Sequence, residues 1–164
     1  MHFVFLSQLS DFLFGFFTLL LRQGFVSIIY NTTMVDEPIT SWSAMFDPKY
    51  AGEVVMIRNS RDALATALLY LGYDLNTTDE AQLREAQQLL ADAKSRGVYQ
   101  SFVMDEIYQK MEGGNAAIGA YYAGDYLSML ENNKDLAFAV PDEGSNWFVD
   151  AMCVLKDAPH KEEA

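Results

Sequence analysis

Cysteine and histidine are scarce in this sequence, and their scarcity excludes several kinds of protein. Cys153 is the one cysteine, so no disulfide can form within the chain, and its apolar neighbours predict a buried small side chain. His2 and His160 stand near the two ends, so neither is placed to activate a nucleophile in the body of the chain. No histidine or cysteine has the spacing of a metal site. We therefore expect no catalytic residues, no metal and no cofactor, and a protein that is not an enzyme.

Basic residues are also few, and the charge balance narrows the range of partners. The 11 lysines and arginines face 23 aspartates and glutamates, which gives a net charge of -12. Nucleic-acid phosphates would be repelled by such a surface, so no nucleic-acid partner is expected. The charge is compatible with a cationic ligand, although it is also common among acidic soluble proteins. A hydrophobic content of 51% is enough for one domain with a core.

The first 23 residues form an apolar head of uncertain origin. Seven of the eleven phenylalanines lie within residues 1–30. The head has neither a basic start nor a small-residue cleavage site, so no signal peptide is recognisable. Gln8 and Asp11 interrupt the apolar run, and an aspartate in a bilayer core costs roughly 3 kcal/mol. Three interpretations remain: a membrane anchor, a packed amphipathic helix, or sequence from a truncated or shifted reading frame, which we favour.

From Gly24 onward the pattern alternates between strands and helices. Ser41 is expected to cap a helical turn, Asn59 or Ser60 to cap the first long helix, and Thr77 with Glu80 has the spacing of a capping box. The predicted strands are residues 25–30, 53–57, 98–103, 116–121, 136–140 and 148–155, and the predicted helices are 61–71, 79–95, 104–111 and 124–131. Such alternation indicates an α/β fold with helices on both faces of a sheet. We expect one lobe over residues 24–158 and a tail over 159–164.

Candidate ligand-binding residues, most of them aromatic or acidic, lie after two of the predicted strands and at the opening of the last, and ligands of α/β sheets bind at the carboxyl ends of strands. These candidates are Asn59, Asp62, Tyr121, Tyr122, Asp125, Trp147, Phe148 and Asp150. Aromatic faces attract cations and carboxylates bind ammonium groups, so the set suits a diamine or a polyamine. Each residue also has a structural interpretation. Trp147 and one of the two tyrosines are equally compatible with the core, Asp62 with favouring the helix dipole, and Asp125 with an ordinary surface position.

The order of several short motifs resembles the spermidine/putrescine-binding family of solute-binding proteins. The matching passages are Ile28–Asn31, Thr40–Trp42, Asp47–Gly52, Arg61–Ala63, Ala67–Leu68, Leu71–Tyr73, Asn76–Asp79, Met111–Gly113, Ala117–Gly119, Tyr122–Gly124 and Glu143–Ser145, followed by Asp150. The likeness covers about residues 28–158. It implies a periplasmic-binding-protein-like lobe with a mixed, mostly parallel sheet. It also implies a periplasmic or cell-surface protein that delivers a polyamine to an ABC permease.

The resemblance assigns amine-binding roles to particular positions. Asn59, Asp62, Tyr122, Phe148 and Asp150 match the positions that hold the amines in the family, and Trp147 adjoins them. Two departures bear on ligand choice. Asn59 stands where aspartate is often found, and Tyr122 and Phe148 stand where tryptophan is common.

The resemblance covers the second of the family's two lobes only. We therefore expect a truncated lobe with an incomplete cleft that binds its ligand weakly by itself. One alternative is that the same fold binds another small solute, such as iron, thiamine or a phosphonate. A phosphonate would need basic residues, and Arg58 and Arg61 are the ones near the cleft. Another is a fragment that binds no solute and forms a homodimer through the apolar head.

Overall fold

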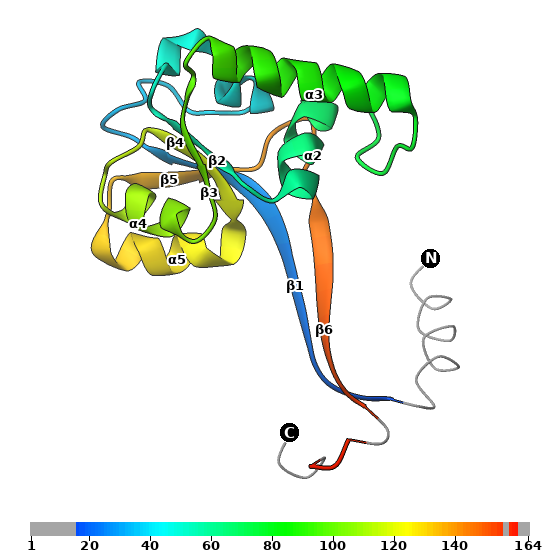
Figure 1. Ribbon diagram of the computed structural model, residues 1–164. Helices are drawn as coiled ribbons and strands as arrows, with labels where there is room; N and C mark the ends of the chain where they lie inside the picture. Colours follow the sequence, from blue (N-terminus) through cyan, green and yellow to red (C-terminus); the bar gives the residue numbers. More distant parts are fainter. Residues whose placement is uncertain (1–15, 156–157, 161–164) are drawn as a thin grey trace. The chain divides into compact units, whose positions relative to one another are not determined.

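A computed structural model of the chain describes residues 16–155 and 158–160 (Figure 1). The strands are β1 (Phe16–Asn31), β2 (Val54–Ile57), β3 (Tyr99–Val103), β4 (Ile118–Tyr122), β5 (Leu136–Ala139) and β6 (Trp147–Leu155). The helices are α2 (Ser60–Tyr70), α3 (Glu80–Ser95), α4 (Glu106–Glu112) and α5 (Ala123–Asn132), with 3₁₀ turns η2 (Trp42–Met45) and η3 (Pro48–Tyr50). From β2 onward, every predicted strand and helix is confirmed.

The sheet is mixed, and most of its strands run in one direction. Its strand order is β3-β2-β4-β1-β5, and β6 pairs with β1. β2 is parallel to β3 and to β4, whereas β1 is antiparallel to both β4 and β5. β2, β3, β4 and β5 therefore share one direction, and β1 opposes them. The predicted α/β class with a mixed, mostly parallel sheet is confirmed.

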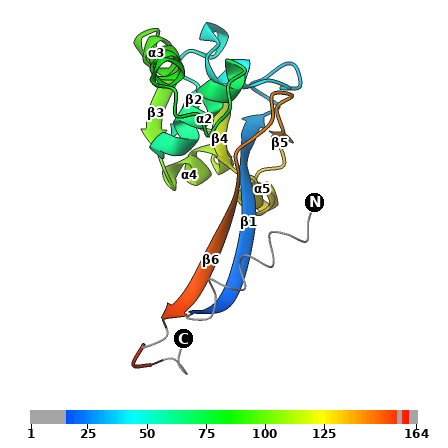
Figure 2. The same cartoon turned by 90° about the vertical axis from the view of Figure 1, so that its right-hand side faces the viewer.

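Helices cover both faces of this sheet. α2 and α3 lie on one side and α4 and α5 on the other, as the two views in Figure 1 and Figure 2 show. All four residues of β2 are fully buried, which explains their unbroken apolar sequence. Gly119 of β4 permits close packing, because a Cβ there would lie 3.0 Å from Val55 Cγ2 and 3.1 Å from Met111 Sδ. The centre of the sheet is thus a rigid support for the residues at its carboxyl edge.

The chain divides into two compact units. One is Gly24–Trp147, and the other joins the described residues up to Gln23 with those from Phe148 onward. Residues 16–23 belong to β1, which begins nine residues before the predicted strand at Phe25. Residues 1–15 lie outside the described residues, so the three interpretations of the apolar head stay open there. The predicted division into 1–23, 24–158 and 159–164 stays a prediction.

Two local expectations are wrong. The predicted capping box fails because α3 begins at Glu80, which is therefore the first residue of the helix and not its third. The cap is Asp79, whose carboxylate accepts from the Ala81 N–H at 2.8 Å. Cys153, expected to be buried, is exposed on β6.

Within the described part of the chain, none of the helices has both the length and the apolar character to cross a membrane.

Candidate ligand-binding site

The start of α2 is fixed by Asn59. Its side-chain oxygen accepts hydrogen bonds from the backbone N–H groups of Arg61 at 3.0 Å and Asp62 at 3.5 Å. The cap places Asp62 in the first turn of the helix, where the exposed N–H dipoles favour a negative charge. The cap already uses the amide oxygen of Asn59, and its amide nitrogen can only donate, so the predicted contact with an ammonium donor would have to share that oxygen.

Asp62 is buried, with 5% of its surface exposed, and holds two hydrogen bonds from other parts of the lobe. Asn146 Nδ2 donates to Asp62 Oδ1 at 2.6 Å, and the Tyr122 hydroxyl donates to Asp62 Oδ2 at 3.4 Å. The structure therefore brings together Asp62 and Tyr122, two of the predicted site residues. Interpreting Asp62 only as a favourable charge in the helix dipole does not account for these long-range contacts.

Among the described residues, no lysine or arginine forms an ion pair with Asp62. The ion pairs of that part of the chain are Lys49–Asp36 at 3.8 Å and Arg84–Glu80 at 3.5 Å. Arg61, next to Asp62 in sequence, instead donates to the side chain of Asn76 at 2.8 Å. Buried carboxylates are normally paired with a positive charge, because desolvation of an unpaired charge is costly. Within the described part of the chain, Asp62 thus has hydrogen-bond donors but no cation.

The sequence did not point to Asn146, which forms the shorter of the two hydrogen bonds of the Asp62 carboxylate. It is 5% exposed and its backbone carbonyl accepts from the Val26 N–H at 3.0 Å. The loop before it is anchored twice more, since the Trp42 indole N–H donates to the Gly144 carbonyl at 2.9 Å and Ser145 Oγ donates to the Val26 carbonyl. A polar asparagine directly before Trp147 was the available signal, but its partner is 84 residues away.

The two tyrosines at the end of β4 have different environments. Tyr121 is 4% exposed and belongs to the core, whereas Tyr122 is half-buried, which confirms the structural interpretation for one of them. Their ring centroids are 5.0 Å apart. Burial, and after it the carboxylates of Asp125 and Asp105, raise the pKa of Tyr121 to about 12. Asp125 and Asp105 therefore place negative charge close to Tyr121.

The remaining predicted residues lie at or after the boundary between the two units. Trp147 is 62% exposed, so the core interpretation of this residue is wrong. Phe148 is half-buried and Asp150 is exposed, and both belong to β6 in the second unit. Their predicted share in one site with Asp62 stays a prediction.

In the part of the chain that the structure describes, no group of three or more histidine, cysteine, aspartate or glutamate side chains is placed to hold a metal ion.

Comparison with known proteins places this chain in a family. Residues 7–164 match the family described as bacterial extracellular solute-binding protein, and the chain belongs to that family. The predicted likeness to spermidine/putrescine-binding proteins is confirmed. The family consists of binding proteins, which confirms the expectation that the chain is not an enzyme.

Individual relatives specify the likeness further. The chain is 30% identical over 145 residues to a norspermidine sensor of Vibrio cholerae. The alignment covers 86% of this chain and 40% of the sensor. The chain is 29% identical over 142 residues to a spermidine/putrescine-binding periplasmic protein of Haemophilus influenzae, spanning 86% of this chain and 39% of that protein.

A solved structure supports the same relationship. The spermidine/putrescine ABC transporter substrate-binding protein of Streptococcus pneumoniae has 32% sequence identity and a TM-score of 0.75, over 85% of this chain and 42% of that chain. The chain thus spans about 40% of the length of these relatives.

Proposed function

We propose that this lobe binds one ammonium group of a polyamine, such as putrescine or spermidine, through the carboxylate of Asp62. In a longer protein it would be the half of the substrate-binding component of an ABC importer that supplies this carboxylate. A substrate-binding component of an importer acts outside the inner membrane, so the proposed location is the periplasm or the cell surface. The partners are then a small cationic ligand and an ABC permease.

The observation that carries the proposal is the buried carboxylate without a cation. Asp62 is 5% exposed, and among the described residues it accepts from two neutral donors, Asn146 and Tyr122, while no cation lies within 4.0 Å of it. An ammonium group at Asp62 would supply the missing charge and form charge-assisted hydrogen bonds.

Nearby aromatic surface supports a ligand with an alkyl chain between its charges. Tyr122 donates its hydroxyl to Asp62 and is half-buried, so its ring borders the carboxylate. An aromatic face contributes roughly 0.5 to 2 kcal/mol to the binding of a cation. The predicted contacts of Asn59, Trp147, Phe148 and Asp150 belong to the same proposal. The relatives described above are named for spermidine, putrescine and norspermidine, which favours polyamines over other cations.

Binding by this chain alone is expected to be weak. Pockets for small ligands usually bury most of the ligand surface, and a chain that spans about 40% of its relatives presents only part of such a pocket. We therefore expect dissociation constants above the micromolar range for both putrescine and spermidine.

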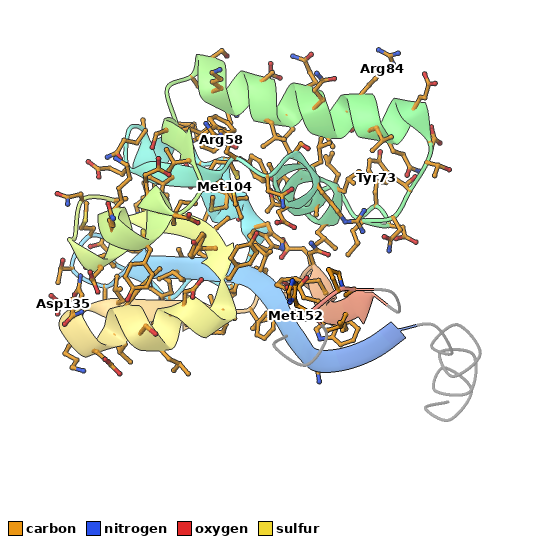
Figure 3. All side chains as sticks on the ribbon, turned by 60° about the horizontal axis from the view of Figure 1, so that its bottom comes forward. Arg58, Tyr73, Arg84, Met104, Asp135 and Met152 are labelled. Carbon is orange, nitrogen blue, oxygen red and sulfur yellow. The ribbon has the colours of Figure 1, made fainter. Side chains whose placement is uncertain are left out.

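Isothermal titration of the full chain with putrescine and spermidine tests the proposal. Asp62→Asn removes the charge while keeping the size of the side chain, and we expect it to weaken binding by about tenfold or more. Asp135→Asn is the matched control, because it changes the net charge equally at an exposed position by the end of α5 (Figure 3). Asp135→Asn should bind putrescine and spermidine with the same affinity as the unmodified chain.

Three results would contradict parts of this account. Equal binding by Asp62→Asn and Asp135→Asn would remove Asp62 from the site. Submicromolar binding would contradict the incomplete cleft, or show that the chain dimerises to complete it. Thermal stabilisation by a phosphonate but by neither polyamine would favour the alternative solute.

A further inference from the structure

A cavity lies between α2 and α3, within the unit Gly24–Trp147. It has a volume of about 690 Å³, well within the range of roughly 300–1,000 Å³ typical of small-molecule sites. Its walls come from α2, α3 and the ends of β2 and β3. Most of the lining is apolar, namely Ile57, Ala63, Leu64, Leu83, Leu90 and Phe102. Asp62, Tyr122 and Asn146 do not line it, so it is separate from the proposed cation site.

Charged residues at this cavity leave one positive charge unpaired. Arg58, Glu80 and Arg84 line it, and Glu80 pairs with Arg84 at 3.5 Å. Arg84 has 77% of its side chain exposed and lies on the outer side of α3, whereas Arg58, also exposed, directly follows the end of β2 (Figure 3). Among the described residues, Arg58 forms no ion pair. In a chain with a net charge of -12, an unpaired arginine beside apolar surface favours an anion.

The position of Arg58 is well fixed at its backbone. Its N–H donates to the Val103 carbonyl at 2.9 Å, which continues the pairing of β2 with β3. Arg58 influences the pKa of a neighbouring carboxylate, that of Glu106. Backbone hydrogen bonds, and to a smaller degree Arg58 and Lys110, lower the pKa of Glu106, but Glu106 lies beyond ion-pair distance and accepts from the Met104 N–H at 3.2 Å. The guanidinium donors of Arg58 therefore stay available.

We propose that this cavity binds an apolar monocarboxylate, with the alkyl or aryl body on the leucines and Phe102 and the carboxylate on Arg58. The guanidinium fork matches the geometry of a carboxylate, and the apolar walls bury the body of the ligand. A polyamine is disfavoured here because Arg58 repels it. A phosphate is disfavoured because the apolar lining would leave its second charge unsolvated.

Titration of the full chain with octanoate, octylammonium and 1-octanol tests this proposal. Octanoate should bind with about tenfold or greater preference over both other probes. Arg58→Gln should remove that preference. Arg61→Gln is the matched control, because Arg61 is three residues away, bonds to Asn76 and does not line the cavity. This control should keep the octanoate affinity, and Asp62→Asn should keep it as well.

A second variant tests the cavity itself. Ala63 is 7% exposed and lines the cavity, so Ala63→Leu should fill part of it and reduce octanoate binding, while thermal unfolding verifies that the variant folds. The proposal is overturned if octylammonium binds as well as octanoate, or if Arg58→Gln and Arg61→Gln have equal effects. It is equally overturned if folded Ala63→Leu binds octanoate as before, or if octanoate does not bind at millimolar concentration.

Discussion

Asp62 and Arg58 both follow the carboxyl end of β2, four residues apart, yet only one of the two side chains is buried. Asp62 lies on the side of α2 that meets Asn146 and Tyr122, so its charge is enclosed by donors from two distant segments. Arg58 is exposed and lines the α2–α3 cavity, where its cation stands beside apolar side chains. The end of β2 is therefore followed by a carboxylate that would attract a cation and by a guanidinium that would attract an anion. The segments packed around each side chain make this difference.

The largest expected effect concerns Trp42, which supports the Asp62 side. Trp42 is 1% exposed, and its indole N–H holds the carbonyl of Gly144 in the loop that carries Asn146. Trp42→Ala should lower the free energy of unfolding by about 3 to 5 kcal/mol, because it empties a large core site and frees the loop. Urea denaturation measures this change.

Trp42→Phe separates the two roles of this residue. It keeps most of the ring but removes the hydrogen bond to Gly144, so it should fold with a smaller loss of stability. We expect it to weaken putrescine binding and to leave octanoate binding unchanged. A variant that weakened both ligands equally would contradict the distinction between the two sides.

A smaller effect is expected at Asn146. Asn146→Ala removes the donor at 2.6 Å from the buried carboxylate of Asp62, which should cost about 1 to 3 kcal/mol of stability. Asn132→Ala is the control, since Asn132 donates to Glu112 at 2.8 Å on the surface and its loss should cost less than about 0.5 kcal/mol. Chemical denaturation of both variants makes the comparison. Equal losses would mean that the Asp62 carboxylate does not depend on this donor.

The smallest effect is expected at Asn59, the cap from which both sides of α2 begin. Asn59→Ala should cost about 1 kcal/mol, because the N–H groups of Arg61 and Asp62 lose their acceptor, whereas Asn59→Ser should keep the cap. If Asn59 also contacts the ligand, as its sequence position predicts, Asn59→Ser will bind putrescine more weakly at unchanged stability. Unchanged binding by this variant would leave Asn59 with the capping role alone.

Local patterns were sufficient to predict most of the fold. The strands and helices from β2 onward follow from apolar periodicity, and the caps of η2 and α2 follow from Ser41 and Asn59, whose partners lie within three residues. The capping box at Thr77 failed for an equally local reason, because the spacing was right but the helix began one residue after Asp79. A pattern of this kind fixes the element but not its first residue.

Features that depend on distant segments were not predictable in the same way. The contact between Asn146 and Asp62 joins residues 84 positions apart, and no local pattern contains it. The cavity beside Arg58 arises from the packing of α3 over α2 and β3, so the sequence showed only two nearby basic residues, Arg58 and Arg61, and no apolar lining. The core interpretation of Trp147 and the expected burial of Cys153 were wrong because an apolar strand sequence does not reveal whether another segment covers it.

Nuclear magnetic resonance of the ¹⁵N-labelled full chain tests the separation of the two sides most directly. On titration with putrescine, the amide signals of Asp62, Tyr122 and Asn146 should shift, while those of Leu83 and Phe102 should not. Octanoate should shift the signals of Leu83 and Phe102 and leave the first group in place. If both ligands shift the same signals, or if putrescine leaves Asp62 and Asn146 unchanged at saturation, the account is contradicted.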